Sequence, residues 1–337
     1  MAVVPDVAIC RHCVYGERFA LPGPGRVVVN VGDTVTPADV VGFAVERGGI
    51  RVVDVAAALH LPARRIQEFL VIKEGQSVRA GELLAQRQGM VRSLQARAPA
   101  DSRAMAVGAG MVVLESFPSE RPIRGAIPGR VLDVIAGEGL VIEDTGAILM
   151  ASAIMGGDFA GPVKMAAPVP ERVLRAEHID ATCHGTIIVG GIGDDAAALK
   201  RAADFGAQGV ILGSVPSSWA RQPLPLPVVI TESYGQAPMN RLAFDTFGEL
   251  AGSLVFAVRR GSRVWVVSPD GAGSGTRYAG TGVTQIGSGT LVRICSGAQA
   301  GSVAEVVESL PGGGEVILRT SRDRLSVSPA NLEAIVR

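Results

Sequence analysis

The sequence predicts a multi-domain, β-rich protein with one small α/β region, and three observations lead to this prediction. Short apolar segments are separated by turn residues, since the 337-residue chain has 43 glycines and 20 prolines. Two patterns of strands and glycine turns repeat within the first 143 residues. Strands alternate with helical segments between residues 180 and 258. The length suggests two or three domains, and a hydrophobic fraction of 47% is enough to form their cores.

Charge and composition narrow the class of function. The chain has 32 basic and 32 acidic residues, so it lacks the net positive charge typical of proteins that bind nucleic acid. No segment approaches the roughly 18 apolar residues of a membrane span, and no basic segment precedes the first apolar stretch. Four cysteines are too few for a disulfide framework. These features predict a cytoplasmic protein that does not contact a membrane.

The first repeat relates residues 29–41, VNVGDTVTPADVV, to residues 71–84, VIKEGQSVRAGELL. Each copy contains an apolar strand, a turn at Gly-Asp or Gly-Gln, a valine and a second apolar strand. The segment between the copies, about 52–70, has apolar residues at helical spacing. It therefore predicts a short helix between two similar β units.

A second repeat relates residues 96–115 to residues 125–143, with Pro99 and Pro128 at matching places. Both copies have a short strand, a glycine turn and another apolar strand, a pattern typical of small barrels or sandwiches. Over residues 70–115, the order of strand, Gly-[Asp/Gln]-x-Val, strand and Ala-Pro resembles the barrel-sandwich hybrid fold of lipoyl and biotinyl domains. The resemblance implies a fold and leaves the function open.

The same resemblance raises the idea of a carrier that bears its cofactor on a lysine. Such a lysine would lie at a hairpin tip, which falls here near residues 89–92, and the chain has no lysine between Lys73 and Lys164. Lys73 precedes the turn of its repeat, and Lys164 follows Val163 where a biotinyl motif has methionine. We therefore expect an unmodified barrel that serves as a scaffold.

The stretch from residue 180 onward predicts parallel strands. TIIVGG (186–191), GVILGS (209–214) and PVVITE (227–232) are typical of buried strands. One helix is expected to begin at an N-cap, Asp194, and to end at Gly206, and another is expected over residues 239–251. Strands that alternate with helices of this length pair in parallel through right-handed crossovers.

The last part of the chain follows a segment rich in Gly, Ser and Thr, residues 268–289, that is typical of a linker. Beyond it, the apolar strands, Gly297, Gly301 and a closing PANLE resemble a KOW-type SH3-like barrel. In relatives such barrels contact RNA or partner proteins. Residues 286–337 hold five arginines, five acids and no aromatic residue, so a protein partner is favoured over RNA.

The order of these parts, with TESYGQAPM at 231–239, resembles a family of uncharacterised bacterial proteins with a lipoyl-like barrel followed by an α/β unit that ends in T-E-[GS]-[FY]-G-x-x-P-M. The resemblance supports the architecture and implies no activity. The predicted domains are a lipoyl-like barrel-sandwich hybrid with a helical insert (1–122), a β-rich connector (123–179), a small α/β domain (180–267), the linker (268–289) and a KOW-type SH3-like barrel (290–337).

Cys10 and Cys13 form a C-x-x-C pair, a spacing that can place two thiolates on one zinc ion. A closed zinc site needs about two more ligands, and the chain has no second C-x-x-C. Free or partly buried thiols are therefore the favoured interpretation, and no cofactor is expected.

The predicted parallel sheet offers the second candidate site. Ligands of open parallel sheets gather beyond the C-terminal strand ends, and strands about 4.8 Å apart can bring Asp195 near Glu232. A cation or small polar ligand could bind there, although capping and turn formation explain the same residues, and an arginine or helix N–H groups would also relieve the carboxylate repulsion. The candidate residues are Gly191, Gly193, Asp194, Asp195, Ser214, Thr231, Glu232 and Tyr234.

These observations favour a non-enzymatic scaffold or protein-binding protein. One alternative is an enzyme, or a sensor of a metal or small ligand, that uses the strand edge. The other alternative is a factor associated with RNA, transcription or translation that acts through the KOW-like barrel. No motif identifies a reaction.

Overall fold

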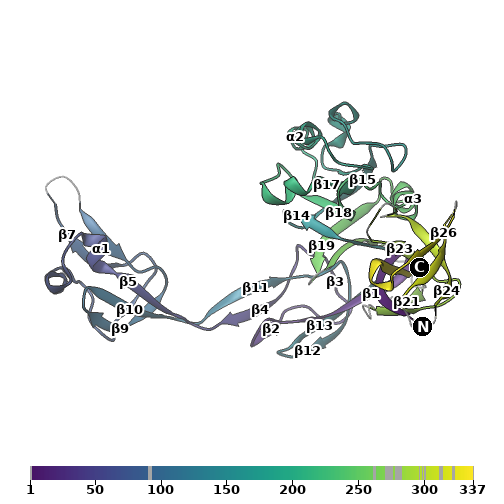
Figure 1. Ribbon diagram of the computed structural model, residues 1–337. Helices are drawn as coiled ribbons and strands as arrows, with labels where there is room; N and C mark the ends of the chain where they lie inside the picture. Colours follow the sequence, from purple (N-terminus) through teal and green to yellow (C-terminus); the bar gives the residue numbers. More distant parts are fainter. Residues whose placement is uncertain are drawn as a thin grey trace.

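The computed structural model describes residues 2–89, 93–260, 263–269, 276–277, 283–295, 297, 299, 301–310, 314–320 and 323–336. Strand makes up 51% and helix 14%, in several sheets, which confirms the β-rich prediction. Figure 1 shows a small lobe, a narrow connection and a larger body that holds both chain ends. No helix in the described ranges is long and apolar enough to cross a membrane.

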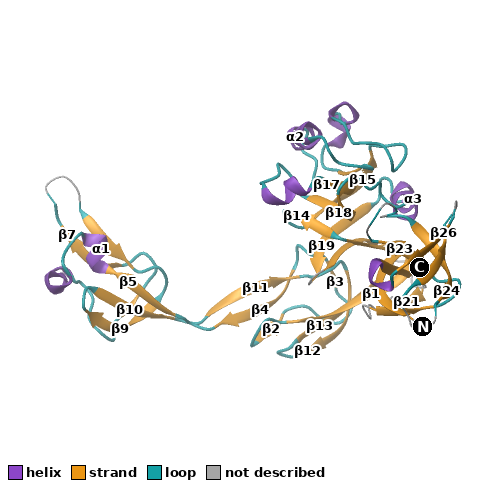
Figure 2. Cartoon of the chain, in the orientation of Figure 1, coloured by secondary structure: helices purple, strands orange, loops and turns teal. Residues whose placement is uncertain are grey.

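The small lobe, residues 50–116, is called the head. A four-stranded antiparallel sheet in the order β5-β10-β9-β6 and a hairpin of β7 and β8 enclose an apolar core that is separate from the core of the body. Figure 2 shows how few helices accompany these strands. The elements are β5 (Ile50–Asp54), α1 (Val55–Leu59), the 3₁₀ helix η1 (Ala63–Phe69), β6 (Ser77–Val78), β7 (Leu83–Arg87), β8 (Leu94–Arg97), β9 (Ser102–Gly108) and β10 (Met111–Ser116).

The predicted helix over 52–70 is wrong at both ends. Its first residues belong to β5, because β-branched Val52 and Val53 pair with β10. Helix α1 begins at Asp54, whose side chain accepts a hydrogen bond from the N–H of Ala57. It ends after five residues at His60, which has a left-handed backbone (φ 51°), and the chain continues as a 3₁₀ helix.

The head is connected to the body by a three-stranded sheet called the stalk, in the order β11-β4-β2. Figure 1 shows β4 and β11 leaving the body side by side toward the head. The stalk strands are β2 (Gly25–Val27), β4 (Val40–Glu46) and β11 (Ser119–Arg124).

The two copies of the first sequence repeat make matching contacts. The N–H of Gly32 donates to Val131, and the N–H of Gly75 donates to Ala104, at 2.8 and 2.7 Å. Both glycines have positive φ, 96° and 84°, and in each copy the following side chain accepts the backbone N–H three residues before it. The outer copy, β3 (Thr34–Val35) with β12 (Gly129–Ile135), encloses the inner copy, β6 with β9, so the repeats are nested.

The first strand, β1 (Ala2–Ala20), connects several sheets of the body. It pairs antiparallel with β13 (Gly139–Ala151) and β22 (Val283–Ile286), and parallel with β21 (Thr276–Arg277) and β27 (Leu332–Val336). The sequence does not predict these pairings. Within the predicted linker, β21 and β22 therefore pair with β1, while residues 270–275 and 278–282 lie outside the described residues.

The three strands predicted after residue 180 pair in parallel, in the order β16 (Ile187–Val189), β17 (Gly209–Val215) and β18 (Val228–Tyr234). A fourth parallel strand, β15 (Phe159–Met165), comes from the predicted connector and pairs with β16. The helix α2 (Ala196–Asp204) connects β16 to β17, and Gly206 follows it with a φ of 75°. The other elements nearby are β14 (Ala153–Met155), η2 (Ala176–His178), η3 (Ala181–Cys183), η4 (Ser217–Arg221), α3 (Arg241–Glu249), β19 (Leu254–Arg260) and β20 (Arg263–Pro269).

The C-terminal strands form an antiparallel sheet with its own buried cluster, and β27 closes against both β23 and β1. We call this part the C-terminal sheet. Its elements are β23 (Leu291–Ile294), β24 (Val303–Ser309), β25 (Val316–Arg319), β26 (Arg324–Val327), η5 (Pro329–Asn331) and β27.

The separate core of the head leads to a stability prediction. Leu114 is fully buried in that core, so Leu114→Ala leaves a cavity and destabilises the head by about 2–5 kcal/mol. We expect calorimetry to show a head transition that moves to lower temperature while the transition of the body stays in place. A single transition that shifts as a whole would mean that the two cores unfold together.

Candidate functional site

The C-terminal ends of β16 and β17 are joined by backbone hydrogen bonds. The N–H of Gly193 donates to Ser214, and the carbonyl of Gly191 accepts from Gly213, at 2.8 and 2.7 Å. The hydroxyl of Ser214 donates to the carbonyl of Ala237 at 2.6 Å. These predicted site residues therefore hold the loops together.

Asp194 and Asp195 are engaged at the start of α2. The N-cap is Asp195, one residue later than predicted, and its carboxylate accepts from the N–H of Ala197 at 3.0 Å. Asp194 instead forms an ion pair with Arg175 at 3.2 Å. The helix cap thus accounts for Asp195, and the ion pair with Arg175 accounts for Asp194.

Glu232, near the end of β18, is the buried carboxylate of this edge, with 2% of its side chain exposed. Its Oε1 accepts from the Thr231 hydroxyl at 3.2 Å and from both the backbone and the side chain of Asn240 at 3.0 and 2.8 Å. No hydrogen bond or ion pair joins it to Asp195 among the described residues. Tyr234, at the end of β18, is 45% exposed.

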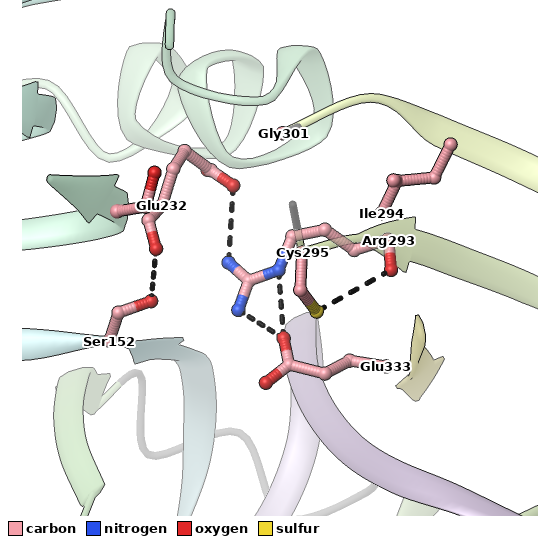
Figure 3. A pocket seen from close by; sticks show the side chains of 8 residues that line it. Ser152, Glu232, Arg293, Ile294, Cys295, Gly301 and Glu333 are labelled. Atoms are coloured by element: carbon pink, nitrogen blue, oxygen red, sulfur yellow. Dashed lines mark hydrogen bonds and ion pairs between the residues drawn. The ribbon is translucent and has the colours of Figure 1, made fainter. Parts of the chain in front are cut away.

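The cation at this edge is an arginine of the C-terminal sheet. Arg293 extends from β23, and its side chain is only 5% exposed. Its Nη1 donates to the carbonyl of Thr231 at 2.7 Å and to Glu232 Oε2 at 3.2 Å, while Nε donates to Glu333 Oε2 at 2.9 Å and Nη2 donates to the same oxygen. Figure 3 shows the guanidinium between the two carboxylates. We call Glu232, Arg293 and Glu333 the buried triad.

The two carboxylates of the triad stabilise the charged form of Arg293. Burial by itself would lower the pKa of the Arg293 guanidinium, but Glu232 and Glu333 outweigh burial and raise that pKa above its ordinary value. The guanidinium therefore stays charged in the folded protein, and it satisfies two carboxylates that come from different elements.

A small cavity adjoins the triad. Its volume is about 50 Å³, which admits water or a small ion but is far below the roughly 300 Å³ of a pocket for a metabolite. Its lining residues are Ser152, Glu232, Ser233, Arg293, Ile294, Cys295, Gly301 and Glu333. Burial and the charge of Glu333 raise the pKa of the Cys295 thiol to about 12, so it is not a thiolate at neutral pH.

Sequence reasoning found Glu232 and missed its partners. The signal for Arg293 was a lone charge within the apolar strand Leu291–Ile294, which indicates a residue that is either exposed or paired. Asn240 carried a second signal, because it directly precedes α3 and caps that helix.

Cys10 and Cys13 lie in β1 and not at a loose chain end. Both are buried, and the thiol of Cys13 lies 3.7 Å from the carbonyl of Gly146 on β13. No group of three or more His, Cys, Asp or Glu residues lies together as a metal site within the described ranges. Cys183 is likewise buried, in η3.

Lys73 and Lys164, the lysines considered as carrier sites, both take part in local contacts. Lys164 lies in β15, where it forms an ion pair with Asp180 at 2.9 Å and contacts the Thr182 hydroxyl. The backbone of Lys73 takes part in the glycine turn of its repeat. The tip of the β7–β8 hairpin includes residues 90–92, which lie outside the described residues.

The head carries an apolar surface on the outer side of its sheet, called the outer face. Alternation along β10 buries Val112 and Leu114 in the head core and exposes Met111 and Glu115, while in β5 only Val53 is partly buried against that core. Ile50 is 73% exposed, Val52 59%, Met105 47% and Met111 45%. Val113 and Ala106 connect these residues across the three strands, since Val113 pairs with both Val52 and Ala106.

The chain matches no family model and no curated protein. The resemblances drawn from the sequence therefore remain predictions, and the function has to be argued from the structure itself.

The buried triad gives a test with an internal control. Arg293→Met leaves two carboxylates without their cation, so we expect urea unfolding to show a loss of about 3–5 kcal/mol. Adding Glu232→Gln to this variant removes one buried charge and restores part of the loss. Arg319→Met, which breaks the exposed pair with Glu305 on the same sheet, should change stability little. Equal losses for both single variants would contradict a role for burial.

Cys295 gives a reactivity test. At pH 8 a thiol with a pKa of about 12 has about a thousandfold less thiolate than one with the ordinary value of 9.0. Iodoacetamide should therefore leave Cys295 unlabelled in the folded protein and label it after unfolding with urea. Peptide mass spectrometry would show both results. Rapid labelling of the folded protein would show that the thiol is open and ionised.

The same thiol gives a pH dependence. Its pKa is raised by folding, so its contribution to stability is complete below pH 9 and is lost as the pH rises toward 12. Between pH 8 and pH 11 the wild type should therefore lose more unfolding free energy than Cys295→Ala. Parallel losses in the two proteins would place the pKa of the thiol near its ordinary value.

Proposed function

We propose that this protein is a non-enzymatic scaffold that binds a partner protein through the outer face of its head. One observation carries the proposal: four large apolar side chains that are 45–73% exposed lie on one face of the head sheet, spread over three strands. Soluble monomers seldom expose contiguous apolar surfaces unless the surface meets a partner. The stalk holds this surface away from the body, where a partner can approach it (Figure 1).

The contacts at the C-terminal strand edge of the parallel sheet also favour this proposal over a ligand-binding site. The polar residues that sequence reasoning offered to a cation or small ligand are occupied by Arg293 and by backbone groups. A sensor or enzyme at this edge would first have to displace a buried guanidinium, which is held by four hydrogen bonds. The scaffold proposal requires no such rearrangement and no cofactor.

A face-directed variant tests the proposal. Met105→Glu combined with Met111→Glu places charge on the outer face and leaves β5 unchanged, so the head should fold with an unaltered melting temperature. In cross-linking and pull-down from the native cell, we expect this variant to lose a partner that the wild type retains.

The control is Val31→Glu, which adds one glutamate at a residue of the body that is 62% exposed. The control should retain the same partner as the wild type. If the double variant and the control retain identical proteins, the outer face is not the binding surface.

A further inference from the structure

Strand β5 is an edge of the head sheet. It pairs with β10, and the described residues provide no strand on its other side. The N–H of Ser116 donates to Gly49 at 3.0 Å, and hydrogen-bonded pairs alternate along an antiparallel ladder. The backbone groups of Arg51 and Val53 therefore face β10, whereas those of Ile50 and Val52 face outward.

The outward N–H and C=O groups of Ile50 and Val52 have no partner strand among the described residues. Backbone N–H and C=O groups are obligatory hydrogen-bonding groups, and an unpaired strand edge is a template for another strand. Natural edge strands are blunted by proline, bulges or charges, and β5 contains no proline and no bulge against β10. Its single charged residue that does not cap a helix is Arg51.

The two sides of β5 differ in chemistry. Ile50 and Val52 extend the outer face to the edge of the sheet. Arg51 points to the opposite side, and it is exposed, as is Arg47 just before the strand. Neither arginine makes an ion pair with any described residue. The edge thus carries Ile50, Val52 and the helix-capping Asp54 on one side and Arg51 on the other.

This charge pattern selects the occupant. A second copy of the chain could pair with β5 about a two-fold axis that keeps both outer faces on one side. The two Arg51 side chains would then lie together on the other side. Like charges across paired strands are destabilising. A strand with acidic residues on one side places a carboxylate opposite each guanidinium instead.

We propose that β5 binds an extended segment of a partner protein in which acidic residues alternate with apolar ones. The segment adds a fifth strand to the head sheet, with its apolar side chains continuing the outer face and its acidic side chains meeting Arg51 and Arg47. This inference rests on the proposed function and names the kind of partner that the head takes. Backbone bonds supply affinity, and the side chains on the two sides supply specificity.

The probe is a phage-displayed library of random decapeptides, selected on the full-length protein. We expect enriched peptides to alternate acidic and apolar residues. Val52→Pro removes an outward N–H while leaving the β10 ladder intact, because proline is tolerated on the open side of an edge strand. Binding of the selected peptides should fall about tenfold or more with the loss of that hydrogen bond and its register. Val52→Thr keeps the N–H and should retain binding.

A second pair of variants tests the charges without changing the backbone. Arg51→Glu should weaken the acidic peptides about tenfold and should favour peptides in which lysine replaces the acids. Arg64→Glu, an equal charge change in η1 of the same head, should leave both affinities unchanged. If no peptide is enriched, if the enriched peptides lack the alternation, or if their binding survives both Val52→Pro and Arg51→Glu, the inference is wrong.

The outcomes separate this inference from the proposed function. Loss of the cellular partner with Met105→Glu and Met111→Glu but not with Val52→Pro keeps the outer face and rejects the added strand. Retention with all of these variants rejects both. A dimer detected by light scattering that Val52→Pro converts to monomer would identify the occupant of the edge as a second copy and would also overturn the inference.

Discussion

The guanidinium of Arg293 connects parts of the chain that are far apart in sequence. It holds the end of β18 through Thr231 and Glu232, and it holds β27 through Glu333. Because β27 also pairs with β1, the triad fixes the C-terminal sheet against the parallel strands and against the strand that crosses the body. Arg293 and Glu232 are both buried, so loss of either one leaves the other as a desolvated charge. The body therefore depends on the correct docking of its C-terminal strands.

The nested repeat explains why the head projects from the body (Figure 1). The outer copy pairs β3 with β12 near the body, and the inner copy pairs β6 with β9 inside the head. Both copies use a glycine at positive φ to turn into a two-residue strand. The inner copy is inserted within the outer copy, so the chain passes once from the body to the head and once back. These two crossing segments pair with each other as β4 and β11. The stalk is thus a direct consequence of nesting.

Local sequence signals predicted elements well and long-range pairings poorly. The glycine turns, the three parallel strands and α2 were found because turn chemistry and apolar runs act within a few residues. The helix over 52–70 failed because pairing of Val52 and Val53 with β10 outweighed their helical spacing. The pairing of β1 with β27 joins opposite ends of the chain, and one sequence holds no signal of such a contact. Glu232 was found as a carboxylate at a strand end, whereas its partner Arg293 required the docking of another sheet.

Whether an arginine is buried in an ion pair or exposed decides which surfaces of this protein can bind a charged partner. In the body, the buried triad uses its cation internally, so the strand edge offers no free charge to a ligand. Arg51 in the head and Arg47 just before it are exposed beside an open strand, and like charges on paired strands disfavour the pairing of two copies of β5. The same residues that oppose self-association are therefore the ones that would recognise an acidic strand. In this proposal, protection of the edge against aggregation and selection of a partner at that edge follow from one physical property, the exposed charge of Arg51 beside the open strand.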